Sequence, residues 1–245
     1  MGDYDFNDLV VDYQFKHIIN ASNKVVEMAP KFVVRAAGAG YRNGFGFSTD
    51  LLANEVANTD GNVLNSGIIN TNANGTEANQ RKAVFIVSDN VHDLFNASGF
   101  INTRDEDTFV EPAIISMTIK LNSPMAVEEL GLVPHNPFII ISQNRGREAR
   151  LPGYALTDLV DQSLFGTADD DSDPAQGDYY KSKTSLPWGI NLPESFDYPM
   201  EKNDIRNGHL RFNDWARSSG FSYMDWYRGV NGYRAVEKLF SRGSD

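Results

Sequence analysis

Alternating apolar and polar residues form the clearest pattern near the start of the chain. Apolar side chains occupy every second position at Leu9, Val11, Tyr13 and Phe15, which is the period of a strand with one buried face. Further short β-forming runs occupy residues 31–36, 45–48, 83–88, 114–121 and 138–142. This succession predicts a mainly β fold, specifically an antiparallel, jelly-roll-like β-sandwich.

Two long polar loops separate these runs, at residues 53–79 and 96–111. The first contains the asparagines Asn58, Asn62, Asn65, Asn70, Asn72 and Asn74. Long loops are uncommon in compact domains unless they bind something or are held down by contacts. We therefore expect both loops at the edges of the sandwich, with a cation or a partner as their ligand.

Helical spacing of apolar residues appears only late in the chain. Residues 204–219 place Ile205, Phe212 and Trp215 near the helical period, and Gly220 stands where a left-handed cap would end a helix. A second short helical piece is expected at 236–240. The sequence contains no internal repeat and no low-complexity linker, so residues 1–245 are predicted to form a single domain.

The residues just before the first strand carry the strongest chemical signal. Oxygen-bearing side chains stand at Asp3, Asp5, Asn7 and Asp8, and this ligand type and spacing suit a tight Ca²⁺ loop. The aromatic residues Tyr4 and Phe6 alternate with them, as anchors of an ordered loop would. An acidic, solvated chain start is the alternative.

A second acidic stretch covers residues 169–173. Carboxylates this close repel one another unless they are solvated or bridged by a cation. Because Ca²⁺ takes six to eight oxygen ligands, we expect this loop to fold over the first one, with Asp170, Asp171 or Asp173 completing the calcium site. A solvated surface loop is the alternative.

Composition narrows the classes of partner. The 22 Lys and Arg against 33 Asp and Glu give a net charge of -11, which argues against nucleic acid and anionic membranes as partners. The chain has no cysteine, so disulfides and cysteine–zinc sites are excluded. No apolar run is long enough to span a membrane, and no direct membrane insertion is expected. Because the acidic loop begins at the third residue, we expect the natural N-terminus to lie further upstream.

The sequence gives only weak signals for other kinds of functional site. The basic turn at residues 145–153 suits carboxylate or glycan recognition, but ion pairs with the acidic loops are the simpler interpretation. The four histidines are scattered, and no nucleophile elbow or phosphate-binding loop is present. We therefore predict that the protein is not an enzyme. The late aromatic residues, Trp188 and Trp226 among them, either stack on sugar rings or form a core.

Several separated motifs resemble the LruC-type domain. They are the opening run 2–13, followed in order by 41–47, 74–78, 136–139, 145–148, 186–188, 195–199 and 225–227. The resemblance covers nearly the whole chain, and it departs from the family at Arg150, where histidine is expected. It implies an exported bacterial protein, often a surface lipoprotein, whose biochemical role is undefined. The acidic opening and the Asp-rich stretch before Tyr179 and Tyr180 are both features of that family.

These observations lead to one functional hypothesis. The protein is expected to be a calcium-binding, exported bacterial domain that acts as a binding or adhesion module at the cell surface. Its partner would be an extracellular protein or a glycan. A carbohydrate-binding module that uses the late aromatic residues is the first alternative, and a glycan-active hydrolase with a carboxylate pair is the second.

Overall fold

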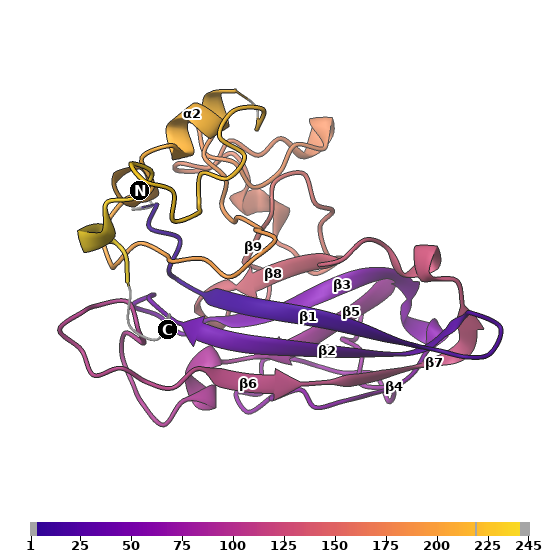
Figure 1. Ribbon diagram of the computed structural model, residues 1–245. Helices are drawn as coiled ribbons and strands as arrows, with labels where there is room; N and C mark the ends of the chain where they lie inside the picture. The colour runs from indigo at the N-terminus through magenta and orange to yellow at the C-terminus, as the bar shows by residue number, and fades with distance from the viewer. Residues whose placement is uncertain (1–3, 219, 241–245) are drawn as a thin grey trace.

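The protein is an antiparallel β-sandwich with an irregular region above one edge (Figure 1). The structure is a computed structural model and describes residues 4–218 and 220–240. Its strands are β1 (Val10–Ile19), β2 (Val25–Ala36), β3 (Gly44–Leu52), β4 (Val56–Asp60), β5 (Lys82–Ser88), β6 (Ala113–Ser116), β7 (Thr118–Met125), β8 (Asn136–Ile140) and β9 (Glu148–Arg150). The predicted sandwich is therefore confirmed.

Two sheets form the layers. One has the order β1-β2-β7-β4, with β6 also paired to β2, and the other has the order β5-β3-β8-β9. Every pairing between named strands is antiparallel. The chain passes repeatedly from one sheet to the other, because β3, β5 and β8 lie in the second sheet while β4 and β7 lie in the first.

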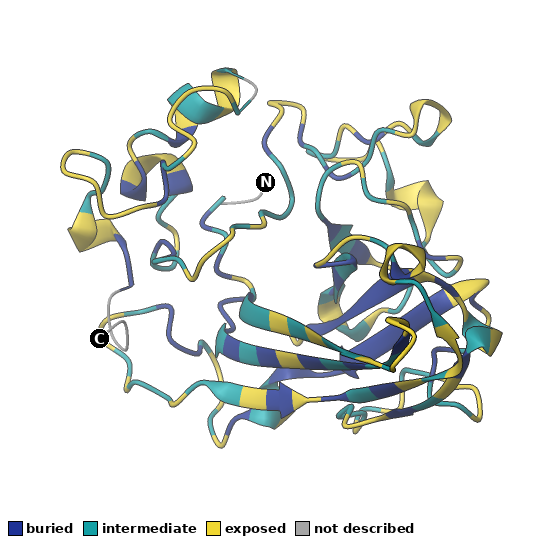
Figure 2. Cartoon of the chain, turned by 45° about the vertical axis from the view of Figure 1, so that its right-hand side comes forward, coloured by how far each residue is buried: buried dark blue, intermediate teal, exposed yellow. Residues whose placement is uncertain are grey.

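The main core lies between the sheets. Met28, Phe32 and Val34 of β2 pack against Phe47 of β3 and Phe85 of β5 in one buried cluster. Buried and more exposed residues alternate along β2, as the stripes in Figure 2 show. This alternation is the sequence period that predicted the strands.

The second sheet is also covered on its outer face. Val84, Ile86, Phe138 and Ile140 form a separate buried cluster, on which Leu64, Ile68 and Ile69 of the long polar loop pack. Asn74 fastens the same loop, since its Nδ2 donates to the carbonyl oxygens of Ala53 and Val56, each at 2.8 Å. Part of the predicted loop, Val56–Asp60, is strand β4. Apolar packing and hydrogen bonds therefore hold this segment, and its expected cation or partner stays a prediction.

Short helical turns make up the rest. The α-helices are α1 (Ile205–Gly208) and α2 (Phe212–Arg217), and the 3₁₀ turns are η1 (Ala53–Glu55), η2 (Val91–Leu94), η3 (Val127–Leu130), η4 (Ile141–Gln143), η5 (Gln162–Leu164), η6 (Pro174–Gln176) and η7 (Val236–Lys238). The predicted helix 204–219 is thus two helices interrupted at His209, which forms an isolated bridge with Arg234. Gly220 caps the second helix with φ +86°, and its N–H donates to Trp215 O. None of the helices among the described residues could cross a membrane.

Two histidines are buried in apolar surroundings. His135, 4% exposed, lies against Phe15 and Phe47 at ring-centroid distances of 4.7 and 6.0 Å. Burial, with a smaller contribution from His17, lowers its pKa to about 4. Burial also lowers the pKa of His209. Both side chains are therefore neutral in the folded protein at neutral pH.

We expect the protein to lose stability as the pH falls from 7 to 5. The unfolded chain binds protons at these histidines near pH 6.5 while the folded chain binds them only at lower pH. The free energy of unfolding therefore decreases below pH 6.5, by about 1 kcal/mol per pH unit for His135 and in the same direction for His209. Thermal melts at pH 7, 6 and 5 measure the change. His135→Phe should show a smaller decrease than the wild type. Equal melting temperatures at all three pH values would contradict the prediction.

Candidate functional site

The predicted calcium loop is an ordered and largely buried segment. Asp5 is 3% exposed and Asn7 is fully buried, whereas Asp8 is exposed. Tyr4 and Phe6 have left-handed backbone conformations, with φ of 55° and 54°. The interpretation of this region as a solvated chain start is therefore wrong for residues 4–7. Asp3 lies outside the described residues.

Segments distant in the sequence hold this loop in place. Asp5 Oδ2 accepts a hydrogen bond from Lys202 N at 3.0 Å, and Asn7 Nδ2 donates to Pro199 O at 3.1 Å. On its other side, Asn7 O accepts a hydrogen bond from Gly38 N at 3.0 Å. The loop therefore lies between the sandwich and the region 199–202.

One oxygen of the loop has no donor. Asn7 Oδ1 is buried without a hydrogen-bond partner, although buried polar atoms are nearly always paired. Together with the buried Asp5 carboxylate it provides hard oxygen ligands of the kind that Ca²⁺ prefers. Within residues 4–218 and 220–240, however, no three His, Asp or Glu side chains are grouped as metal ligands. A calcium site would thus need amide, backbone or water oxygens, or Asp3, in addition.

The second acidic loop contacts the opening loop through Tyr4, and its other described contacts are with its own residues and with residues 181–188. Tyr4 OH donates to Asp169 Oδ2 at 2.7 Å. Asp170 accepts from Trp188 Nε1 at 2.8 Å and from several donors of its own loop. Asp173 caps the turn η6 by accepting from Ala175 N, and Asp171 is exposed. The role of Asp170, Asp171 and Asp173 as calcium ligands stays a prediction.

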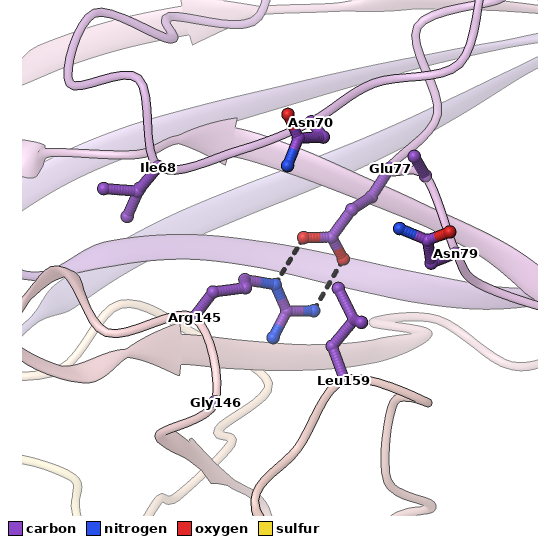
Figure 3. Close-up of a pocket in the computed structure, with 8 residues that line it drawn as sticks. Ile68, Asn70, Glu77, Asn79, Arg145, Gly146 and Leu159 are labelled. Atoms are coloured by element: carbon purple, nitrogen blue, oxygen red, sulfur yellow. Dashed lines mark hydrogen bonds and ion pairs between the residues drawn. The ribbon is translucent and has the colours of Figure 1, made fainter.

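The basic turn forms ion pairs, but with different acids from those expected. Arg145 binds the carboxylate of Glu77 through two nitrogens (Figure 3), and it also pairs with Glu148. Arg150 Nε donates to Glu148 Oε2 at 2.8 Å. Burial raises the pKa of Glu148, but the guanidinium groups of Arg150 and Arg145 outweigh this effect and hold the pKa below its ordinary value. The turn is therefore a neutralised structural cluster.

A cavity of about 250 Å³ lies beside this cluster. Glu77 and Arg145 form part of its lining, with Asn70, Asn79, Ile68 and Leu159 around them (Figure 3). No local pattern marks Glu77 as a functional residue, because it lies in a polar stretch without apolar periodicity, and only the family motif 74–78 includes it. Its role depends on Arg145, which is 68 residues away.

Most of the late aromatic residues form a core, whereas Phe221 is 86% exposed. Trp226 is 1% exposed and packs with Phe212 and Tyr227. Trp188 is half-buried, stacked on Tyr4 with the ring centroids 6.3 Å apart. Trp188 and Trp226 are therefore not exposed platforms, and the carbohydrate alternative stays a prediction for the other late aromatic residues.

A groove of about 260 Å³ nevertheless lies next to this core. One side consists of Leu151, Pro152 and Tyr154, which follow β9, and the other includes Trp215 and Trp226. The sequence did not indicate this groove, because its two sides come from separate parts of the chain. Its lining is mostly apolar.

A known family accounts for most of the chain. Residues 23–227 match the family described as "Domain of unknown function (DUF4842)". The chain belongs to this family. The match begins after the opening loop, and the LruC name suggested by the sequence motifs stays a prediction.

The fold also occurs in a solved structure. The chain is similar to a protein from Bacteroides ovatus whose crystal structure is described as that of a "Putative lipoprotein", with 18% identity and a TM-score of 0.66. The similarity covers 98% of this chain and 71% of the other. At this identity it shows the fold alone. A search of curated proteins gave no match.

Proposed function

We propose that this DUF4842 chain is a non-catalytic, calcium-binding domain of an exported bacterial protein, acting as a binding or adhesion module at the cell surface. The observation that carries the calcium proposal is the buried opening loop, in which the Asp5 carboxylate stands two residues from the unpartnered Asn7 Oδ1. In this proposal both side chains are ligands of a divalent cation at a place from which solvent is excluded.

Export is supported by the structural neighbour. That protein is described as a "Putative lipoprotein", and a lipid anchor holds a folded domain at a membrane surface. Its partner in our proposal is an extracellular protein or a glycan. The net charge of -11 favours partners that are neutral or basic.

We expect Ca²⁺ to raise the melting temperature and Asp5→Asn to remove most of that rise. At a hundredfold excess over Kd, a ligand that binds only the folded state adds about 2.7 kcal/mol to the free energy of unfolding, or about 5 to 10 °C for a chain of this size. Asparagine retains an oxygen for Lys202 N but lacks the charge that attracts the cation. Thermal melts in EDTA, Mg²⁺ and Ca²⁺ measure the effect.

The matched control is Asp105→Asn, because Asp105 is an exposed aspartate outside the opening loop. This variant should respond to Ca²⁺ as the wild type does. An unchanged calcium response in Asp5→Asn would show that Asp5 is not a ligand. Equal melting temperatures in EDTA and Ca²⁺ for the wild type would contradict the calcium proposal.

A further inference from the structure

The opening loop also belongs to the irregular region above the sandwich. We call residues 186–240 the C-terminal lobe. Tyr4 and Phe6 pack into its aromatic cluster, which contains Phe212 and Trp226, and the Phe6 and Phe212 ring centroids lie 6.3 Å apart. Figure 1 shows the indigo start of the chain rising from β1 into the orange and yellow lobe.

The backbone contacts connect the same partners. Ile205 N donates to Tyr4 O at 2.8 Å, next to the hydrogen bonds that Asp5 makes with Lys202 and Asn7 makes with Pro199. Along the loop, the aromatic residues alternate with the two proposed ligands. Each of the two proposed ligands, Asp5 and Asn7, thus also makes a hydrogen bond to the lobe.

The other attachment of the loop is to the sandwich. Asn7 O accepts from Gly38 N. Immediately beyond, Val10 begins β1 and packs in a buried cluster with Ala36 of β2 and with Tyr198 and Phe240 of the lobe. The opening loop thus contacts both the lobe and the sandwich, which are also joined directly where Arg35 of β2 donates to Ser195 and Phe196.

We infer that Ca²⁺ at the opening loop fastens the C-terminal lobe to the sandwich, an inference that rests on the proposed calcium site. The physical reason is thermodynamic linkage. A cation held by Asp5 and Asn7 binds the conformation of residues 4–8 seen here, and that conformation is the one that contacts the lobe. Binding therefore favours the docked lobe over the released lobe by the ratio of the calcium affinities of these two conformations.

Docking also determines the shape of the apolar groove. Leu151, Pro152 and Tyr154 line it from the segment after β9, while Trp215 and Trp226 line it from the lobe. Release of the lobe would separate these two sides. Calcium would therefore control whether the groove is complete.

Hydrogen exchange on the full chain tests the inference, with calcium binding measured in parallel by titration calorimetry. The amides of Lys202 and Ile205 donate to the opening loop, so we expect exchange across residues 199–209 to be at least tenfold slower in Ca²⁺ than in EDTA. Residues of β3, paired on both sides, should change much less. Asp5→Asn should abolish the difference, and Asp105→Asn should retain it.

The possible failures are distinguishable. If Ca²⁺ binds and exchange of residues 199–209 is unchanged, the inference is overturned while the calcium site stands. If exchange slows equally in the lobe and in β3, the cation stabilises the whole fold and the inference is again overturned. If calorimetry detects no binding, both the site and the inference fail.

Discussion

Glu148→Gln is expected to destabilise the protein by about 3 to 5 kcal/mol, the cost of breaking a buried ion pair from one side. Glu148 is 7% exposed and neutralises two guanidinium groups, those of Arg145 and Arg150. Glutamine has nearly the same shape, but it removes the charge and turns an N–H₂ donor toward other donors. Glu77 alone then balances both arginines. Urea unfolding at pH 7 measures the loss as a lower midpoint.

Glu194→Gln is the matched control. Glu194 pairs with Arg228 at 2.7 Å, but both side chains are about half exposed. A solvated pair of this kind contributes at most about 1 kcal/mol. If the two variants unfold at the same urea concentration, the buried cluster does not stabilise the fold in the way we propose.

The contribution of Glu148 to the free energy of unfolding also depends on pH. Its pKa is held below the ordinary value of 4.5, so the folded state releases its proton more readily than the unfolded chain does. The stabilisation is present above pH 4.5 and is lost as the pH falls through the lower folded value. This pH range lies below the range from 7 to 5, in which protonation of the histidines is expected to lower the stability.

Gly38→Ala is expected to destabilise the protein by about 3 kcal/mol, because a new methyl group has no room. A Cβ on Gly38 would lie 2.2 Å from Asn7 Oδ1 and 2.8 Å from Asn7 O. The carbonyl belongs to the backbone, and the side chain is held by its bond to Pro199. Thermal melts should show a decrease of about 6 to 12 °C.

Gly40→Ala provides the control two residues away. No heavy atom lies within 4 Å of a Cβ at Gly40, so its melting temperature should stay close to that of the wild type. Similar losses in both variants would mean that the backbone freedom of the glycines matters here, and not the contact with Asn7.

The sequence predicted strands where apolar alternation was strong, and it missed those that depend on distant partners. β4, with the sequence Val-Ala-Asn-Thr-Asp, has little apolar content and is a strand because it pairs with β7. β9 consists of Glu148, Ala149 and Arg150, which resemble a charged turn until the ion pairs are known. In both cases tertiary contacts outweigh local preference.

The late helix illustrates the same limit. Its apolar spacing predicted helical structure correctly, but the continuous helix 204–219 is interrupted at His209. Gly208 packs closely on Leu239, where an added Cβ would lie 2.6 Å from Leu239 Cδ2. His209 meanwhile bridges to Arg234. The helical spacing of the apolar residues gives no information about these contacts with residues 234–239.

The candidate site was only partly predictable. The types and alternation of residues 4–7 indicated an ordered loop with anchors, and Tyr4 and Phe6 are indeed packed. The burial of Asp5 and Asn7 depends on Gly38 and on residues 199–202, which no local pattern connects with the opening loop. The ion pair of Glu77 with Arg145 was equally unpredicted, although Glu77 belongs to the motif 74–78.

The attachment of residues 4–8 to residues 199–205 has a consequence for how the chain is made. Lys202 and Asp5 are 197 positions apart, so a ribosome finishes the sandwich strands before it produces the residues that enclose the opening loop. Contacts this far apart in the sequence form slowly because a long chain segment must close. The opening loop therefore remains without these partners until residues 199–205 have been synthesised.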